Sequence, residues 1–239
     1  MNILLTGGNG VLGKEIGKII PNCIMPSKSE LNVRNKKQVS DFIQSQKIDV
    51  IIHTAALTSV RECENDKNSA WNTNVKGTQN LVNSFLENNP QGYFVYVSTA
   101  CVFRGNEKMY SEKSLPNPAN FYALTKLIGE TIVQSLPNHL IIRTNFVGRN
   151  KWPYEKAFTD RFGTYLFAEQ VANGIKEIME AKKNGIIHLA GNKILSMFEL
   201  AKITTPDVKP MTLKDYSGPH LTIDMTLDSL NWKKYDIRK

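Results

Sequence analysis

The sequence contains few cysteines and no long apolar run, and both shortages limit what the protein can be. Its 239 residues include only three cysteines, which lie far apart at Cys23, Cys63 and Cys101. An odd and scattered set argues against a disulfide framework or a zinc cluster and favours a reducing compartment. No apolar stretch reaches the roughly 18–20 residues of a bilayer-spanning helix. Met1 leads directly into an apolar strand without a basic n-region, so we expect no secretory signal and a cytoplasmic protein.

Acidic residues are also fewer than basic ones. The net charge is +8, from 30 Lys and Arg against 22 Asp and Glu. A basic excess can indicate nucleic-acid binding, but here it consists of isolated pairs such as Lys36-Lys37 and Lys233-Lys234, interleaved with acids. Because no basic stripe or arm is present, we expect no nucleic-acid partner. A positive balance is compatible with an enzyme whose ligands carry phosphates.

What the chain does contain is a regular alternation of apolar and amphipathic segments. The pattern predicts strands at residues 2–6, 23–25, 48–52, 93–97 and 140–143, with helices at 11–20, 36–46, 69–88 and 121–136. Repeated strand–helix units with continuous apolar strands predict an α/β fold with a Rossmann-like, doubly wound parallel sheet.

Beyond residue 143 the pattern loosens. It predicts a helix at 168–182, a strand at 185–189 and a short helix at 197–203, and three prolines follow in the tail. We therefore expect a dinucleotide-binding domain over residues 1–145. Residues 146–239 are expected to form a small substrate-binding region that packs on the same domain.

A glycine-rich segment follows the first predicted strand and opens the first helix. Gly7, Gly10 and Gly13 would allow a tight turn, a close backbone approach to a pyrophosphate and close helix–strand packing, respectively. The helix N-terminus, at Val11 and Leu12, would then present unpaired N–H groups to the phosphates. This context predicts a dinucleotide site, the alternative being a glycine-rich turn with no ligand.

The end of the second predicted strand should determine the ribose preference. A carboxylate there suits the 2′-hydroxyl of NAD, but this chain has Ser27 and Lys28 and no acid before Glu30. A hydroxyl and a cation are better partners for a 2′-phosphate. The sequence therefore favours NADPH and leaves NAD open, and Lys28 could instead be a solvated loop lysine.

A tyrosine and a lysine share one face of the predicted helix at 121–136. Tyr122 and Lys126 are four residues apart, and the hydroxyl of Thr99 at a preceding strand end could meet them. A free Tyr titrates near ~10, and an ammonium beside it brings that proton into working range. The pattern predicts a nicotinamide-dependent enzyme. Alone, the same two residues would more often be a half-buried ring and a solvated amine, and it is the other blocks of the chain that favour the catalytic interpretation.

Several blocks in order resemble the extended short-chain dehydrogenase/reductase family, especially its dTDP-4-dehydrorhamnose reductase-like branch. The blocks are residues 6–13, 53–56, 74–78, 98–99, 122–126 and 143–144. The resemblance implies that Tyr122 is the acid/base, that Lys126 lowers its pKa and binds the nicotinamide ribose, and that Thr99 hydrogen-bonds the reacting carbonyl. It also implies supporting or cofactor-lining positions for Asn74, Ala55 and Ala56.

The chain departs from that branch at three places. Ala100-Cys101 replaces the usual Asp-Tyr, and Cys101 stands where bifunctional epimerase-reductases carry a catalytic Cys. A tuned thiolate could abstract a proton α to a ketone, whereas a buried Cys could simply be a small hydrophobe. Arg61 replaces a typical acid, and the segment between residues 148 and 158 is short. Lys151 or Lys156 could be the partner of Cys101.

The resemblance implies an NAD(P)H-dependent reductase of a nucleotide-linked 4-keto-6-deoxy sugar. A 3,5-epimerisation that uses Cys101 is a further hypothesis, and the resemblance also suggests a homodimer. Two alternatives stay open. One is a non-catalytic NADP-binding regulatory subunit, because the regulatory subunit of methionine adenosyltransferase resembles the same branch. The other is a reductase of a smaller carbonyl substrate.

Overall fold

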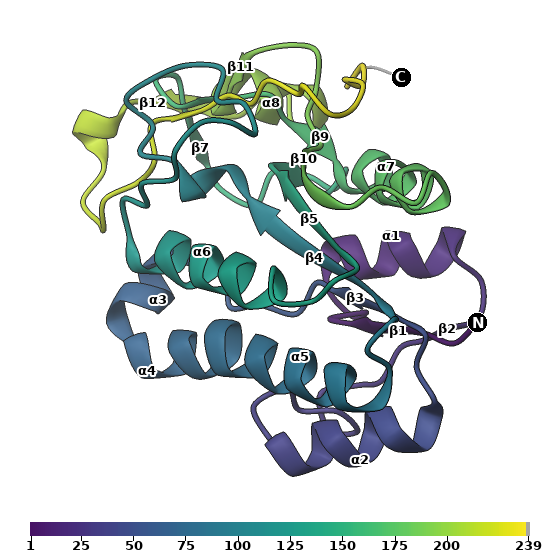
Figure 1. Cartoon of the computed structure of the whole chain (residues 1–239). Helices are drawn as coiled ribbons and strands as arrows, with labels where there is room; N and C mark the ends of the chain where they lie inside the picture. The colour runs from purple at the N-terminus through teal and green to yellow at the C-terminus, as the bar shows by residue number, and fades with distance from the viewer. Residues whose placement is uncertain (238–239) are drawn as a thin grey trace.

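Six parallel strands form the centre of the computed structural model, which describes residues 1–237 (Figure 1). Their order is β2-β1-β3-β4-β5-β10, and every neighbouring pair is parallel. The bounds are β1 (Ile3–Thr6), β2 (Cys23–Ile24), β3 (Val50–His53), β4 (Tyr93–Thr99), β5 (His139–Thr144) and β10 (Gly185–His188). The predicted Rossmann-like parallel sheet is therefore confirmed.

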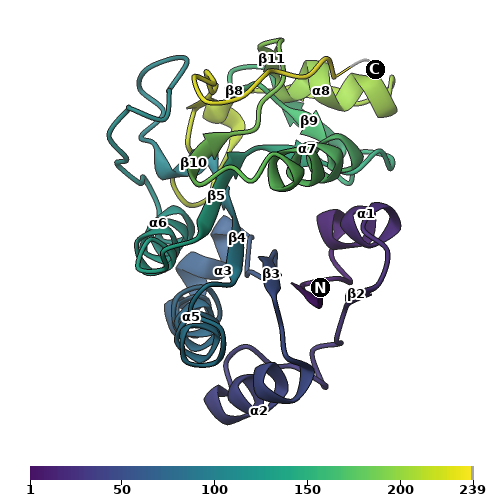
Figure 2. The same ribbon diagram turned by 45° about the vertical axis from the view of Figure 1, so that its right-hand side comes forward.

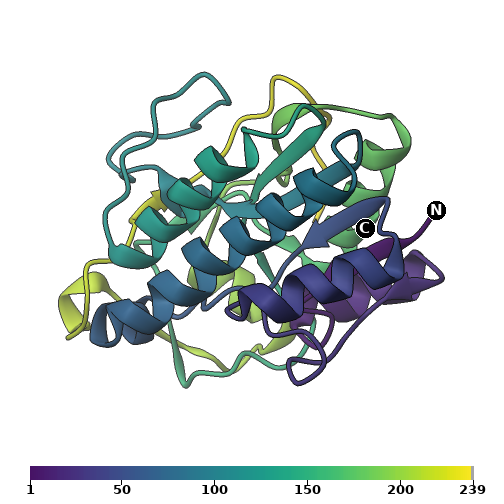
Figure 3. The same ribbon diagram turned by 60° about the horizontal axis from the view of Figure 1, so that its bottom comes forward.

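Helices cover both faces of this sheet. One face carries α1 (Val11–Ile19) and α7 (Ala168–Glu180), and the other carries α2 (Lys36–Gln46), α5 (Gly77–Asn88) and α6 (Phe121–Val133) (Figure 2). Figure 3 shows α2, α5 and α6 side by side. Strand residues alternate between two cores, so that Leu5 and Ile52 pack toward α1 and α7, whereas Leu4 and Ile51 pack toward α2 and α5.

The long helix expected over residues 69–88 differs from the structure in its first half. A short helix, α3 (Val60–Asn65), precedes it, and α4 (Lys67–Ala70) runs into a π-helical turn, η1 (Trp71–Lys76), before α5 begins. The side chain of Ser59 caps α3 by accepting a hydrogen bond from the N–H of Glu62. A six-residue helix is too short for its periodicity to be recognised, so the sequence pattern missed it.

Apart from α7 and β10, the chain after β5 forms a cap over the carboxyl ends of β4 and β5 (Figure 1). It contains α8 (Met197–Thr204), a single 3₁₀ turn η3 (Leu213–Asp215) and the strands β6 (Phe146–Val147), β7 (Lys156–Phe158), β8 (Phe162–Gly163), β9 (Leu166–Phe167), β11 (Leu195–Ser196), β12 (Lys209–Met211) and β13 (Asp224–Met225). These strands pair in three small sheets. The predicted division near residue 145 stays a prediction, and the central sheet takes β10 from beyond that point.

Within residues 1–237, no helix combines the length and the apolar character that crossing a membrane would require. The same residues contain no cluster of three or more His, Cys, Asp or Glu side chains suited to a metal ion.

Candidate functional site

The strand order reverses direction around β1, which has β2 on one side and β3 on the other. In parallel α/β sheets, ligands bind in the crevice that such a reversal opens at the carboxyl ends of the strands. A cleft of about 360 Å³ lies at this place in the structure. Its walls come from the glycine loop after β1, from the segment after β2 and from residues 54–57 after β3.

The glycine loop fits closely against the end of β3. Gly7 has a positive φ of 75°, and a Cβ added there would lie 2.7 Å from the backbone nitrogen of Ala55. A Cβ at Gly13 would lie 2.2 Å from the carbonyl oxygen of Gly7, so α1 can approach β1 only with glycine at this position. Gly10 caps α1 without a side-chain acceptor, which leaves the first N–H groups of the helix available to an anion.

The first two residues of α1 differ in their exposure to the solvent. Val11 is 53% exposed beside the cleft, whereas the Leu12 side chain is only 3% exposed and packs in the core. Leu12 could therefore contact a cofactor only through its backbone. Ala55 and Ala56 line the cleft as expected.

Two cations lie at the ribose side of the cleft. Lys28 lines it, and so does Arg34, which the sequence reading missed. The Arg34 Nε donates to Thr73 Oγ1 at 2.8 Å and its Nη2 to Ser69 O at 3.1 Å, so η1 and α4 hold the guanidinium in place. Arg34 could have been found from the sequence, because it is a cation in the loop between the second strand and the second helix, where Lys28 also lies. Ser27, which the sequence also suggested, is not part of the lining, and its N–H and hydroxyl bond to Glu30 and Ser29 within its own turn.

Asn74 supports the loop behind the cleft. Its Oδ1 accepts a hydrogen bond from the N–H of Leu57 at 2.8 Å, and its Nδ2 donates to Leu57 O and to Thr125 Oγ1, both at 2.9 Å. Asn74 lies in the π-helical turn η1 and is 1% exposed. It thus connects the loop after β3 with α6, which carries the predicted catalytic tyrosine.

The predicted catalytic residues Thr99 and Tyr122 come together at the carboxyl end of β4. Thr99 ends that strand and is 6% exposed, and half-buried Tyr122 lies in the first turn of α6, which the Asn120 side chain caps. Burial raises the Tyr122 pKa well above its ordinary value, Cys101 raises it further, and a hydrogen bond with Thr99 opposes the shift. The phenol therefore carries its proton at neutral pH, as a proton donor requires.

Lys126 lies one helical turn after Tyr122 and is 4% exposed. Its Nζ is 4.0 Å from the centroid of the Tyr96 ring. Burial lowers the Lys126 pKa to about 7, and the charge of Glu130 opposes that shift. The neighbours that shift the Tyr122 pKa are Cys101, Thr99 and Cys63, so the expected lowering by Lys126 stays a prediction.

Cys101 follows Thr99 in a short 3₁₀ turn, η2 (Ala100–Val102). Its half-buried thiol lies 3.5 Å from Met225 Sδ. Arg161 Nη2 also contacts Met225 Sδ, at 3.8 Å. Lys151 and Lys156, the partners suggested by the sequence, are both exposed. Arg161 is 8% exposed, and it and Cys101 both contact Met225 Sδ.

Arg61 also has a structural contact that the sequence did not reveal. It stands where an acid was expected, and its Nη2 donates to the carbonyl oxygen of Ser217 at 3.4 Å. This contact links α3 to the loop after η3. The position therefore joins the sheet domain to the cap in this chain.

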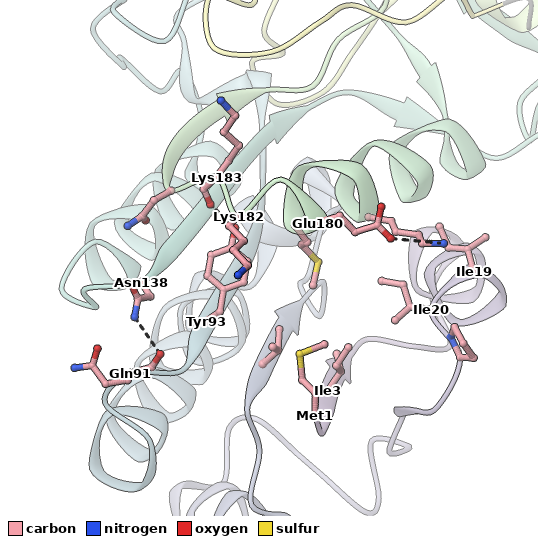
Figure 4. A pocket seen from close by; sticks show the side chains of 15 residues that line it. Met1, Ile3, Ile19, Ile20, Gln91, Tyr93, Asn138, Glu180, Lys182 and Lys183 are labelled. Atoms are coloured by element: carbon pink, nitrogen blue, oxygen red, sulfur yellow. Dashed lines mark hydrogen bonds and ion pairs between the residues drawn. The ribbon is translucent and has the colours of Figure 1, made fainter.

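A second cavity, of about 530 Å³, lies at the opposite end of the sheet, where the strands begin (Figure 4). Ile3, Ile19, Ile20 and Tyr93 contribute to its lining, between α1 and the end of α7. Because it opens at the amino ends of the strands, it is separate from the dinucleotide cleft and from Tyr122.

Comparisons with known proteins agree with this geometry. Residues 1–158 match the family described as RmlD substrate binding domain. The chain is 30% identical over 227 residues to the dTDP-4-dehydrorhamnose reductase of Aggregatibacter actinomycetemcomitans, which covers 83% of this chain and 76% of the relative. It is 26% identical over 236 residues to methionine adenosyltransferase 2 subunit beta of Bos taurus, covering 83% and 70%.

Solved structures show the same fold. A dTDP-4-dehydrorhamnose reductase from Clostridium acetobutylicum has a TM-score of 0.88 and 28% identity, covering 95% of this chain and 90% of that chain. The Bacillus anthracis enzyme of the same name, solved in complex with NADP, has a TM-score of 0.89 and 22% identity, covering 99% and 96%. The family match and the 30% identity show that this chain belongs to the RmlD substrate binding domain family and is an oxidoreductase of the extended short-chain dehydrogenase/reductase type.

Proposed function

We propose that the protein is an NADPH-dependent reductase of a nucleotide-linked 4-keto-6-deoxy sugar. The observation that carries this proposal is that Thr99, at the end of β4, and protonated Tyr122, in the first turn of α6, meet on the carboxyl side of the sheet, where the dinucleotide cleft also opens. A ketone bound there would meet a proton donor and a hydroxyl on one side. The dTDP-4-dehydrorhamnose reductases among the relatives carry this activity in their names.

Each side chain would have a separate task in the reduction. Bound NADPH would supply the hydride that reduces the ketone carbon. Tyr122 would donate its proton to the carbonyl oxygen as negative charge develops there, and Thr99 would orient that oxygen through its hydroxyl. Lys126 as an ammonium would hold the nicotinamide ribose and stabilise the phenolate that Tyr122 leaves behind.

Replacing Lys28 by alanine should raise the KM for NADPH by about 10-fold or more, because a charge-assisted hydrogen bond contributes about 1.5–3 kcal/mol. The KM for NADH, which has no 2′-phosphate, should stay the same. Initial rates with each cofactor test this. The matched control is Lys36→Ala, which removes the same charge from an exposed position outside the cleft lining. Equal losses with NADPH and NADH would contradict the assignment of Lys28.

The substrate proposal is tested by following NADPH oxidation with purified protein and a panel of nucleotide-linked 4-keto-6-deoxy sugars and small carbonyl compounds. Turnover of a nucleotide sugar supports the proposal and identifies the nucleotide. Turnover of the small carbonyl compounds alone would contradict the nucleotide-sugar proposal and favour a reductase of a smaller substrate. NADPH binding without any turnover would favour a regulatory role, as in the methionine adenosyltransferase subunit that the chain resembles.

We further propose that Cys101, as a thiolate, abstracts a proton α to the ketone to give an enolate, and that reprotonation of this enolate on its opposite face by solvent water completes an epimerisation before reduction. The position of this cysteine two residues after Thr99 and the contact with Met225 Sδ that it shares with Arg161 support this role. In D₂O, wild-type protein should exchange the α hydrogens of the substrate for deuterium. Cys101→Ser should lower that exchange about 10²-fold or more, while hydride transfer continues. The control is Cys23→Ser, in β2, and unchanged exchange in Cys101→Ser would refute the role.

The cytoplasmic location and the homodimer remain predictions. No contact in the single chain bears on either of them.

A further inference from the structure

A charged cluster is buried behind the predicted catalytic residues. Arg143 Nη2 and Nε donate to the Glu130 carboxylate at 2.7 and 3.0 Å, and Ser98 Oγ donates to Glu130 Oε1 at 2.5 Å. The relative exposures of Glu130, Arg143 and Ser98 are only 2%, 2% and 5%. The three side chains thus share one carboxylate in the interior of the protein.

This cluster joins the elements that carry the catalytic groups. Glu130 lies on α6, one turn after Lys126 and two turns after Tyr122, on the same helix face. Ser98 directly precedes Thr99 on β4, and Arg143 lies on β5. Glu130 therefore fixes α6 to the carboxyl ends of both strands.

The helix also approaches β4 closely at the neighbouring residue. A Cβ at Gly129 would lie 2.1 Å from the Tyr96 hydroxyl oxygen, so only glycine lets α6 lie this near. The Tyr96 ring then contacts the Lys126 ammonium. The position of Lys126 is thus set by Gly129 and Tyr96 on one side and by the Glu130 cluster on the other.

A buried ion pair adds little net stability compared with apolar residues of similar size, so stability alone does not explain the cluster. The ionisable groups around Lys126 suggest another role. They are Tyr122 and Glu130 on α6, Tyr96 on β4 and His53 on β3. Burial, helped by Lys126, lowers the His53 pKa to about 3, and burial keeps Tyr96 protonated. Glu130 is the charged group among them that favours the ammonium.

We propose that Glu130 is a positioning residue: anchored by Ser98 and Arg143, it sets α6 against Thr99 and keeps Lys126 in the ammonium form. The inference rests on the proposed reductase function, which gives that ammonium its task. On this proposal, the Ser98–Glu130–Arg143 cluster helps to set the upper limit of the pH range in which the enzyme is active.

The expected pH dependence follows from the protonation of Lys126. Because reduction needs the ammonium, kcat/KM should fall as the pH rises through the Lys126 pKa, which is about 7. Removing the negative charge of Glu130 lowers that pKa. At an effective dielectric of about 20, a charge one helical turn away shifts a pKa by about one unit or more. Without the Glu130 charge, the fall of kcat/KM at alkaline pH should therefore begin about one pH unit lower.

The variant must separate this effect from unfolding, because Glu130→Gln alone leaves the Arg143 guanidinium buried and unpaired. The double variant E130Q/R143M removes both charges and should fold. It should still show the alkaline limb displaced to lower pH, by less than the loss of the Glu130 charge alone would give because the opposing Arg143 charge is removed too, and a lower kcat. Ser98→Ala, which removes one hydrogen bond and keeps the charge, should retain the wild-type pH profile. A double variant with the wild-type pH profile would overturn the proposal.

A direct titration keeps the inference testable without a substrate. The ¹³Cε signal of Lys126, assigned with Lys126→Met, reports its pKa by NMR. The proposal predicts a lower pKa in E130Q/R143M than in wild type, and equal pKa values would refute it. Failure of the reductase proposal would instead remove turnover from wild type and leave this titration difference in place.

Discussion

Replacing Tyr122 by phenylalanine is expected to lower kcat for sugar reduction by about 10²–10⁴-fold, the usual contribution of a positioned general acid. The phenol keeps its proton because burial raises its pKa, and Thr99 hydrogen-bonds to it. The phenylalanine ring fills the same half-buried space without an acidic proton. NADPH should still bind, since the glycine loop that would face its phosphates lines the cleft and Tyr122 is not among the lining residues.

The measurement is single-turnover NADPH oxidation, with cofactor affinity measured by fluorescence titration. Tyr93→Phe is the matched control, because it removes a hydroxyl that bonds to Lys183 O at the amino edge of the sheet. That variant should retain wild-type kcat. If Tyr122→Phe reduces the sugar within a few fold of the wild-type rate, Tyr122 is not the proton donor.

Arg143→Ala is expected to lower the free energy of unfolding by about 3–5 kcal/mol, because it leaves a buried carboxylate without its cation. Glu130 and Arg143 are both nearly inaccessible to solvent. With the guanidinium removed, Glu130 would retain only the Ser98 hydroxyl as a hydrogen-bond donor among the described residues. The cost should appear as an earlier midpoint in urea unfolding, measured by circular dichroism.

Two comparisons make this result interpretable. Lys37→Ala breaks an exposed helix pair with Asp41, whose side chains are 83% and 62% exposed, and should change stability little. E130Q/R143M should recover much of the stability that Arg143→Ala loses, since it leaves neither Glu130 nor Arg143 as an unpaired charge and Lys126 can lose its proton. If the Arg143→Ala protein were as stable as the Lys37→Ala protein, the buried Arg143–Glu130 pair would not be needed for the stability of the fold.

The central sheet could be predicted from the sequence because its signals are local. Continuous apolar runs such as Val50–His53 are typical of parallel strands buried on both faces. The turn between β1 and α1 requires glycine at Gly7 and Gly13 for steric reasons that hold in any such turn. The cleft residue Lys28 followed from its position after the second strand, whereas Ala55 and Ala56 were implied by the family resemblance.

The remaining features depend on contacts between distant residues. Arg34 reaches the cleft because Thr73 and Ser69 hold its guanidinium, about forty residues further along the chain. Arg161 approaches Cys101 only through Met225 in the cap. Strands of two or three residues in the cap, such as Phe162–Gly163, are too short for an alternating pattern to identify. The Arg143-Thr144 block was visible in the sequence, but its partner Glu130 was not.

The central claim is that this chain transfers a hydride from NADPH to the ketone of a nucleotide-linked sugar. The most direct test uses NADPH that carries deuterium at the transferable position, with mass spectrometry of the sugar product. We predict one deuterium at the former ketone carbon in wild type, and incorporation about 10²–10⁴-fold slower in Tyr122→Phe. Bound NADPH with no deuterium in any sugar of the panel would contradict it.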